Sequence, residues 1–172
     1  RLKMADLKLI ESIKAKAAAK RRTIVLPESQ DERVLKAAEQ LIRENICNVI
    51  VLGNEEKVRT DASSLGVSLS GVRIIDPLKS EKLSDFANIF YNMRKHKGMT
   101  IEKAHETLKH ELFFGAMLVK EQMADGFVAG SASPTADVLR AAIQCVGMPE
   151  GISIVSSFFL MVFPEKVISF AD

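Results

Sequence analysis

Short apolar runs rich in β-branched residues alternate with segments of helical periodicity along most of this chain. Three runs, at residues 23–26, 48–52 and 72–76, are each closed by a proline or a glycine, and a fourth lies at 126–130. Such runs predict buried strands. Strands that alternate with helices indicate a parallel sheet with helices on both faces, so the predicted fold class is α/β.

The segments between these runs carry helical signals. After the first strand, Ser29 and Glu32 form a capping-box pattern that predicts a helix start. Longer helices are predicted over residues 80–97, which Gly98 should end, and over residues 100–123. The remaining predicted helices cover residues 6–20, 55–64 and 135–146.

The pattern changes after Gly147. Two strand-like segments, 152–163 and 166–171, flank a predicted turn at Pro164–Glu165, which indicates an antiparallel hairpin. A hairpin without partner strands is only marginally stable. We therefore expect residues 1–147 to form an incomplete N-terminal α/β domain. Residues 148–172 should open a second, truncated domain of a longer protein, unless another chain covers the hairpin.

Charge and cysteine content restrict the class of protein. The net charge is +2, from 24 basic and 22 acidic residues, which argues against a dedicated nucleic-acid-binding protein. The longest apolar run, residues 158–163, is too short to span a bilayer, and we expect no membrane partner. Cys47 and Cys145 give no disulfide framework, which favours a reducing cytoplasmic location. The sequence shows no cysteine–histidine cluster that would suggest a metal site.

The loop after the fourth strand predicts an anion site. Gly130 allows close approach of the backbone, and the hydroxyl groups of Ser131 and Thr135 follow it. Ser133 is a favourable N-cap and Pro134 suits the first helical position. The free N–H groups at this helix start would then face a small anion, with the hydroxyl groups beside them.

Two arginines are candidates to bind the same anion. Arg140 follows the helix start by about two turns, and long helical side chains lean toward the N-terminus. Its guanidinium group could bind an oxyanion through two hydrogen bonds. The alternative is an exposed ion pair between Asp137 and Arg140. Arg94 lies in the last turn of a predicted helix, where a solvated cation is the alternative explanation.

Several segments of the chain, taken in order, resemble the phosphate acetyl/butyryltransferase family. They are TIVLPESQDERVLKAA (23–38), VIVLGNEEKV (49–58), IIDP (74–77), YNMRKHKGMTIEKA (91–104), DGFVAGSASPTADVLRAAIQ (125–144) and ISIVSSFFLM (152–161). The resemblance implies a reversible acetyl transfer in which acetyl-CoA and phosphate give acetyl phosphate and CoA, without a metal or another cofactor. It also implies two α/β domains like those of the isocitrate and isopropylmalate dehydrogenases, with the site between them, and a homodimer at full length.

The same resemblance assigns roles to individual residues. Arg94, Thr135 and Arg140 match functional positions of the family and become the expected catalytic residues. Gly130, Ser131 and Ser133, together with Thr135 and Arg140, are expected to bind phosphate or the acyl phosphate. The general base and the CoA-binding residues are expected in a C-terminal part outside this chain, so that the chain alone should be inactive.

The chain departs from the family pattern at two loop positions. Many members carry a histidine where this chain has Ser133, and a proline where it has Ala141, so a role of that histidine does not carry over. Three alternatives stay open. One is a phosphate butyryltransferase. Another is a non-catalytic module that senses acetyl-CoA. The third is a non-catalytic structural partner that pairs through the exposed hairpin.

Overall fold

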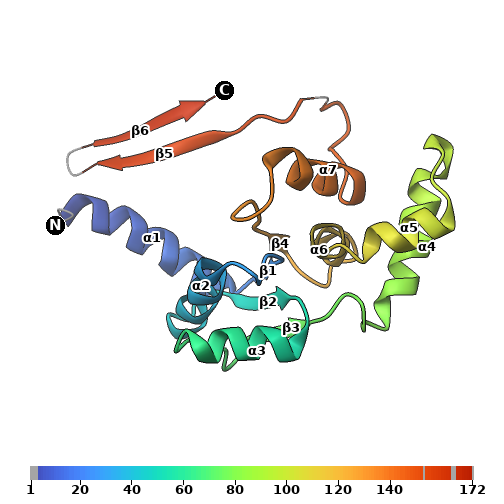
Figure 1. Cartoon of the computed structure of the whole chain (residues 1–172). Helices are drawn as coiled ribbons and strands as arrows, with labels where there is room; N and C mark the ends of the chain where they lie inside the picture. The colour runs from blue at the N-terminus through green and yellow to red at the C-terminus, as the bar shows by residue number, and fades with distance from the viewer. Residues whose placement is uncertain (1–3, 153, 164–165, 172) are drawn as a thin grey trace.

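The computed structural model describes residues 4–152, 154–163 and 166–171, which form a layered α/β unit followed by a β-hairpin (Figure 1). The helices are α1 (Met4–Lys20), α2 (Glu32–Arg43), α3 (Glu55–Ser64), α4 (Lys82–Arg94), the 3-10 helix η1 (Lys95–Lys97), α5 (Ile101–Leu108), α6 (Glu111–Lys120) and α7 (Thr135–Cys145). The strands are β1 (Thr23–Leu26), β2 (Asn48–Leu52), β3 (Arg73–Ile75), β4 (Gly126–Phe127), β5 (Phe158–Phe163) and β6 (Lys166–Ala171).

The first four strands form a parallel sheet in the order β3-β2-β1-β4. Strand β1 pairs in parallel with β2, where Val25 lies opposite Ile50, and with β4, where Val25 lies opposite Phe127. Strand β3 pairs in parallel with the far side of β2. The predicted parallel sheet is therefore confirmed, with β1 and β2 as its inner strands.

Helices cover both faces of this sheet (Figure 1). Neighbouring strand residues face opposite sides, so Val25 and Ile50 belong to one apolar cluster whereas Leu26 and Val51 belong to the other. Helices α2 and α3 pack on the side of Leu26, and α4 to α7 contribute to the side of Val25. A sheet buried on both faces explains why its strands read as continuous apolar runs.

Several predicted element boundaries and caps are wrong. The long helix expected over residues 100–123 is interrupted after Leu108, and His110 starts α6 by accepting a hydrogen bond from the N–H of Leu112 at its Nδ1 atom. The cap of α2 is Asp31 rather than Ser29, since the Asp31 side chain accepts from the N–H of Arg33. The strand expected at 126–130 ends at Phe127. The N–H of Val128 still donates to the carbonyl oxygen of Val25, but from Gly130 onward the N–H groups turn to the Glu28 side chain.

The end of α4 agrees with the sequence. A short turn of 3-10 helix continues to Lys97, and Gly98 follows with a φ of 81° in the left-handed region. Glycine adopts this conformation without the penalty that a Cβ atom brings, which is why it stops helices so often.

The hairpin pairs β5 with β6 in antiparallel register, with Phe158 opposite Ala171 and Phe163 opposite Lys166. Strand β5 begins at Phe158, six residues later than predicted from residue 152. The predicted turn at Pro164–Glu165 lies outside the described residues. Phe158 and Phe159 are 66% and 68% exposed, so the hairpin presents apolar side chains on its surface. Across the ranges that the structure describes, no helix combines the length and apolar character needed to cross a membrane.

Leu108 and Leu78 offer a matched test of the assigned core. Leu108 is fully buried in the cluster under α4 to α7, whereas Leu78 is 63% exposed. Leu108→Ala is expected to lower the free energy of unfolding by about 2–5 kcal/mol, because it removes buried methyl groups and leaves a cavity. Leu78→Ala should cost less than about 0.5 kcal/mol. Urea denaturation measures both, and equal losses would contradict this core.

Candidate functional site at the carboxyl ends of β1 and β4

The strand order creates a topological switch point between β1 and β4. The chain adds β2 and β3 on one side of β1, and then places β4 on the other side. In open parallel sheets, ligands bind outside the carboxyl ends of the strands at such a point. Two segments leave the sheet there: residues 27–31 after β1, and residues 128–134 after β4. We call the second segment the switch-point loop.

Glu28 connects these two segments. Its side chain is buried, with 3% exposed. Its Oε2 atom accepts hydrogen bonds from the N–H of Gly130 at 2.8 Å and from both the N–H and the hydroxyl group of Ser131 at 2.9 Å. Its Oε1 atom accepts from the N–H of Ala132 at 3.1 Å. Donors that the sequence suggested for an external anion are thus bound to a carboxylate of the chain itself.

The surroundings of Glu28 keep its carboxylate charged. Burial favours the neutral form, but hydrogen bonds from Ser133, Ser131 and Ala132 favour the carboxylate and lower the pKa of Glu28 to about 2. Successive backbone N–H groups form a concavity that suits an anion. The opposite side of the loop is also held, because Nη2 of Arg33 donates to the carbonyl oxygen of Ser131 at 2.9 Å.

Helix α7 begins directly after the switch-point loop, at Thr135. The expected N-cap at Ser133 is wrong: Pro134 takes the cap position, and among the described residues no side chain caps this helix. The residues just before Ser133 are held by Glu28, and the Ser133 hydroxyl also favours the charged form of that carboxylate. Thr135 is exposed at the helix start, where the N–H groups of the first turn favour a negative charge.

Arg140 lies on α7 and forms an ion pair with Asp137. The distance between Nη1 of Arg140 and Oδ1 of Asp137 is 2.5 Å, and both side chains are partly exposed, at 55% and 43%. This is the ion pair that the sequence offered as an alternative to anion binding. An exposed pair of this kind contributes little stability, so it does not prevent Arg140 from binding a stronger anionic partner.

Arg94 lies at the end of α4 and is only half-exposed, so it is not a fully solvated helix end. Within the part of the chain that the structure describes, its buried Nε atom has no hydrogen-bond partner. Buried donors are nearly always bonded, so this atom is a candidate to bind a ligand. Cys145 of α7 is near: burial raises the pKa of its thiol to about 12, while the charge of Arg94 lowers it.

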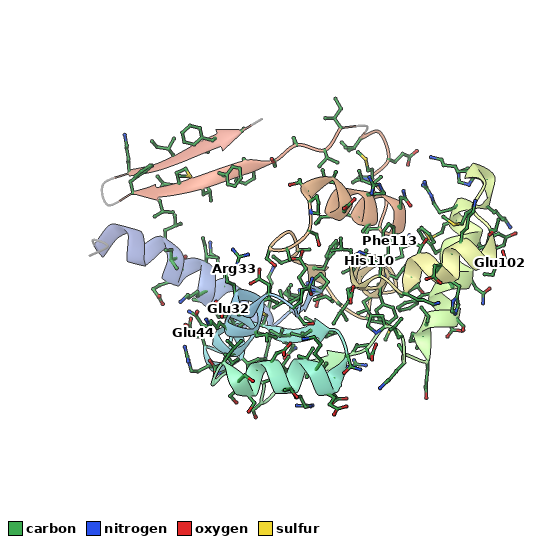
Figure 2. All side chains as sticks on the ribbon, viewed as in Figure 1. Glu32, Arg33, Glu44, Glu102, His110 and Phe113 are labelled. Carbon is green, nitrogen blue, oxygen red and sulfur yellow. The ribbon has the colours of Figure 1, made fainter. Side chains whose placement is uncertain are left out.

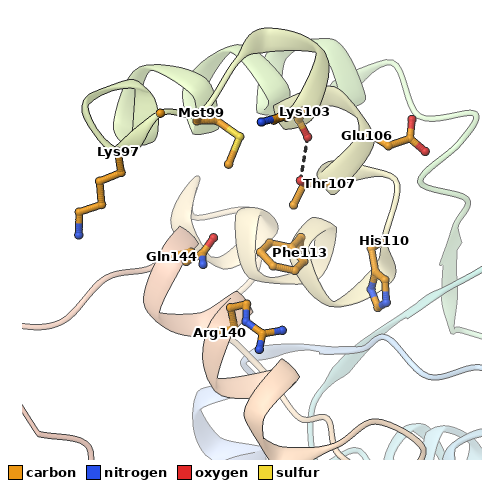
Figure 3. Close-up of a pocket in the computed structure, with 10 residues that line it drawn as sticks. Lys97, Met99, Lys103, Glu106, Thr107, His110, Phe113, Arg140 and Gln144 are labelled. Carbon is orange, nitrogen blue, oxygen red and sulfur yellow. Dashed lines mark hydrogen bonds between the residues drawn. The ribbon is translucent and has the colours of Figure 1, made fainter.

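A cavity of about 700 Å³ lies between α7 and the segment that runs from η1 to α6 (Figure 3). Figure 3 shows Arg140 and Gln144 on one side, with Met99, Lys103 and Thr107 across from them. Its lining combines cationic, polar and apolar side chains, namely those of Lys97, Met99, Lys103, Glu106, Thr107, His110, Phe113, Arg140 and Gln144, together with Gly98. Three cations against one carboxylate make this cavity suitable for an anionic ligand with an apolar portion.

The structure therefore divides the residues predicted for the site. Arg140 shares a cavity with Lys97, which follows Arg94 by three residues, whereas Gly130, Ser131 and Ser133 surround Glu28. Sequence reasoning missed Glu28, although an acidic residue two positions after the end of a buried strand was a usable signal. Across the described ranges, no group of three or more His, Cys, Asp or Glu side chains could hold a metal ion.

Comparisons with known proteins identify the family. The family model described as phosphate acetyl/butaryl transferase matches residues 8–172. The chain belongs to the phosphate acetyl/butaryl transferase family. It is 48% identical over 159 residues to the phosphate acetyltransferase of Thermoanaerobacterium thermosaccharolyticum, and that match covers 92% of this chain and 48% of the relative. The phosphate acetyltransferase of Acetivibrio thermocellus is 47% identical, with 92% and 47% covered.

Solved structures of the phosphate acetyl/butaryl transferase family share this fold. The EutD phosphotransacetylase from Staphylococcus aureus superposes with a TM-score of 0.85 at 38% identity, over 95% of this chain and 49% of that chain. A phosphotransacetylase from Streptococcus pyogenes gives a TM-score of 0.86 at 35% identity, over 95% and 50%. The chain thus spans about half the length of the relatives that it matches.

The lowered pKa of Glu28 predicts a specific sensitivity to acid. A carboxylate whose pKa is lower in the folded state stabilises the fold above its unfolded value, and this contribution is lost as the pH falls through the folded value. Between the ordinary value of 4.5 and about 2, the wild type should therefore lose more stability than Glu28→Gln. Asp31, whose pKa is also lowered to about 2, and Arg33 are present in both proteins, so their effects cancel.

Thermal unfolding across this pH range measures the difference. Glu32→Gln is the matched control, because Glu32 is exposed and pairs only with the neighbouring Lys36 among the described residues. It should keep the acid sensitivity of the wild type. Parallel curves for the wild type and Glu28→Gln would show that the Glu28 carboxylate contributes nothing to the fold.

Proposed function

We propose that this chain is part of an enzyme that reversibly transfers an acetyl group between CoA and inorganic phosphate. The observation that carries the proposal is the cavity beside Arg140, whose cations and apolar residues suit an acyl phosphate or a phosphorylated thioester substrate. The family and its relatives named phosphate acetyltransferase support the same activity. Because the chain spans about half of those relatives, the activity is proposed for a full-length protein that contains it.

In the proposed reaction, the thiolate sulfur of CoA attacks the carbonyl carbon of acetyl phosphate. The new carbon–sulfur bond forms as the bond from the carbonyl carbon to the phosphate oxygen breaks, and phosphate leaves with the electron pair. The thiol proton passes to a general base, which we expect in the remaining part of the full-length protein, with the CoA-binding residues. The developing negative charge on the carbonyl oxygen needs fixed donors.

We assign the contacts to the phosphate group and to the carbonyl oxygen to the catalytic residues predicted from the sequence. Arg140 holds the phosphate group, since its guanidinium can release the exposed Asp137 and bind two phosphate oxygens. Thr135 adds its hydroxyl group and the N–H groups of the first turn of α7. Arg94 supplies its unpartnered Nε–H from the end of α4. Gly130, Ser131 and Ser133 contribute by shaping the loop that carries Thr135.

Further properties belong to the same proposal. The relatives named as acetyltransferases favour acetyl over butyryl transfer. Residues 1–147 would form part of one domain, and residues 148–172 would begin the next, whose remainder or a second copy would cover the exposed hairpin. Cys47 and Cys145 are free and buried, which supports a reducing cytoplasmic compartment.

Arg94 offers a test of the catalytic assignment. In the full-length protein, Arg94→Ala should lower the rate of acetyl transfer at least about tenfold, as expected for the loss of a charged hydrogen bond worth about 1.5–3 kcal/mol. Arg94→Lys should recover only part of the rate, because lysine cannot reproduce the planar donor pattern. Release of CoA from acetyl-CoA, followed with a thiol reagent, measures the rate. An unchanged rate in Arg94→Ala would remove Arg94 from the site.

Arg140 can be compared with a matched arginine on the surface. Arg140→Ala should raise the KM for acetyl phosphate about tenfold or more, because a charged contact to the phosphate is lost. Arg59→Ala is the control: Arg59 is 56% exposed and pairs with Glu55, much as Arg140 is 55% exposed and pairs with Asp137. The KM of Arg59→Ala for acetyl phosphate should stay within about twofold of the wild-type value. Similar values for the two variants would refute the assignment of Arg140.

A further inference from the structure

The side chain of Glu28 binds the backbone of the switch-point loop. A single carboxylate accepts four hydrogen bonds from Gly130, Ser131 and Ala132, more than 100 residues away in the sequence. Glu28 as a residue is 3% exposed, so few water molecules compete for these donors. Hydrogen bonds to a charged group in such surroundings are stronger and more directional than exposed ones.

The loop is fixed from its carbonyl side as well. Arg33 donates to the carbonyl oxygen of Ser131, and the Arg33 guanidinium is itself held by Asp31. Figure 2 shows Arg33 at the start of α2, which begins directly after the segment that carries Glu28. That segment is closed by a hydrogen bond of 3.1 Å from the N–H of Asp31 to the carbonyl oxygen of Glu28. The N–H groups of the loop and the carbonyl oxygen of Ser131 are therefore both bound by the segment that joins β1 to the start of α2.

Helix α7 begins three residues after Ala132, directly after the end of the loop. Gly130 has a φ of 105°, which places the backbone in a region where other residues are strained. This bend turns three consecutive N–H groups toward Glu28. The direction in which α7 leaves the loop, and hence the positions of Thr135 and Arg140, depends on this bend.

We propose that Glu28 is a positioning residue: its buried carboxylate holds residues 130–132 and so fixes where Thr135 and Arg140 meet the phosphate. The inference rests on the proposed function only in taking Thr135 and Arg140 as the phosphate-binding residues. Glu28 acts through the loop and does not touch the substrate. Since it occupies the loop N–H groups, the phosphate binds farther along, at α7.

The test uses Glu28→Gln, which keeps the shape of the side chain but removes the charge and turns an NH₂ group toward the loop donors. By isothermal titration calorimetry on the full-length protein, the Kd for inorganic phosphate should rise about tenfold, while the Kd for CoA stays within about twofold. Glu28→Asp keeps the charge but has a shorter side chain. Its Kd for inorganic phosphate should lie between that of the wild type and that of Glu28→Gln. Glu32→Gln changes the same charge at an exposed position and should match the wild type.

A second readout reports on the loop directly. Amide hydrogen exchange at Gly130, Ser131 and Ala132 should become at least about tenfold faster in Glu28→Gln, because these N–H groups lose a charged acceptor. Exchange that is unchanged would overturn the proposal, since Glu28 would not hold the loop. Faster exchange with unchanged phosphate affinity would also overturn it, because Glu28 would then be structural only.

These measurements separate the two proposals. A wild-type protein that binds phosphate but transfers no acetyl group would contradict the proposed function. The comparison of phosphate affinities would still decide the role of Glu28, because it does not depend on turnover.

Discussion

Parallel pairing on both sides of β1 is the constraint on which the rest of this structure depends. Because β1 lies between β2 and β4, its residues are buried on both faces of the sheet, and helices must cover both. The same pairing brings the carboxyl ends of β1 and β4 side by side, although they are about a hundred residues apart in the sequence. The candidate site follows from this topology, because the segments after β1 and β4 both begin at the same edge of the sheet.

The donors of the switch-point loop are satisfied within the chain by the carboxylate of Glu28. The switch-point loop directs three N–H groups and a hydroxyl group to one place, and Glu28 supplies the anion that they require. A loop with unsatisfied donors would be costly and mobile. With Glu28 bound, the loop has a defined shape, and in the proposed function the first turn of α7 and Arg140 bind the external phosphate. In this proposal, the internal carboxylate of Glu28 shapes the phosphate site and lies beside it rather than in it.

The sequence was sufficient for the fold class and for most elements, because strand-length apolar runs and helical periodicity both reflect burial. It failed where a local choice depended on a distant partner. Ser133 is a good N-cap by itself, but the distant Glu28 holds the three residues before it, and Pro134 takes the cap position. The helix expected over residues 100–123 is interrupted at His110, where an N-cap bond replaces helical continuity. Arg94, Thr135 and Arg140 were candidates from the helix pattern, and the family resemblance made them the expected catalytic residues. The structure adds the burial of Arg94 Nε and the cavity beside Arg140.

The central claim is that phosphate binds at α7 while Glu28 keeps the loop donors. Nuclear magnetic resonance of the labelled full-length protein during a phosphate titration tests it most directly. We predict that phosphate shifts the amide signals of Thr135 and Ala136 and the Nε–H signal of Arg140. The amide signals of Gly130, Ser131 and Ala132 should keep their positions, because their acceptor is unchanged. Large shifts at those three amides, with the signals of Thr135 and Arg140 unmoved, would show that phosphate displaces Glu28 and would contradict the account.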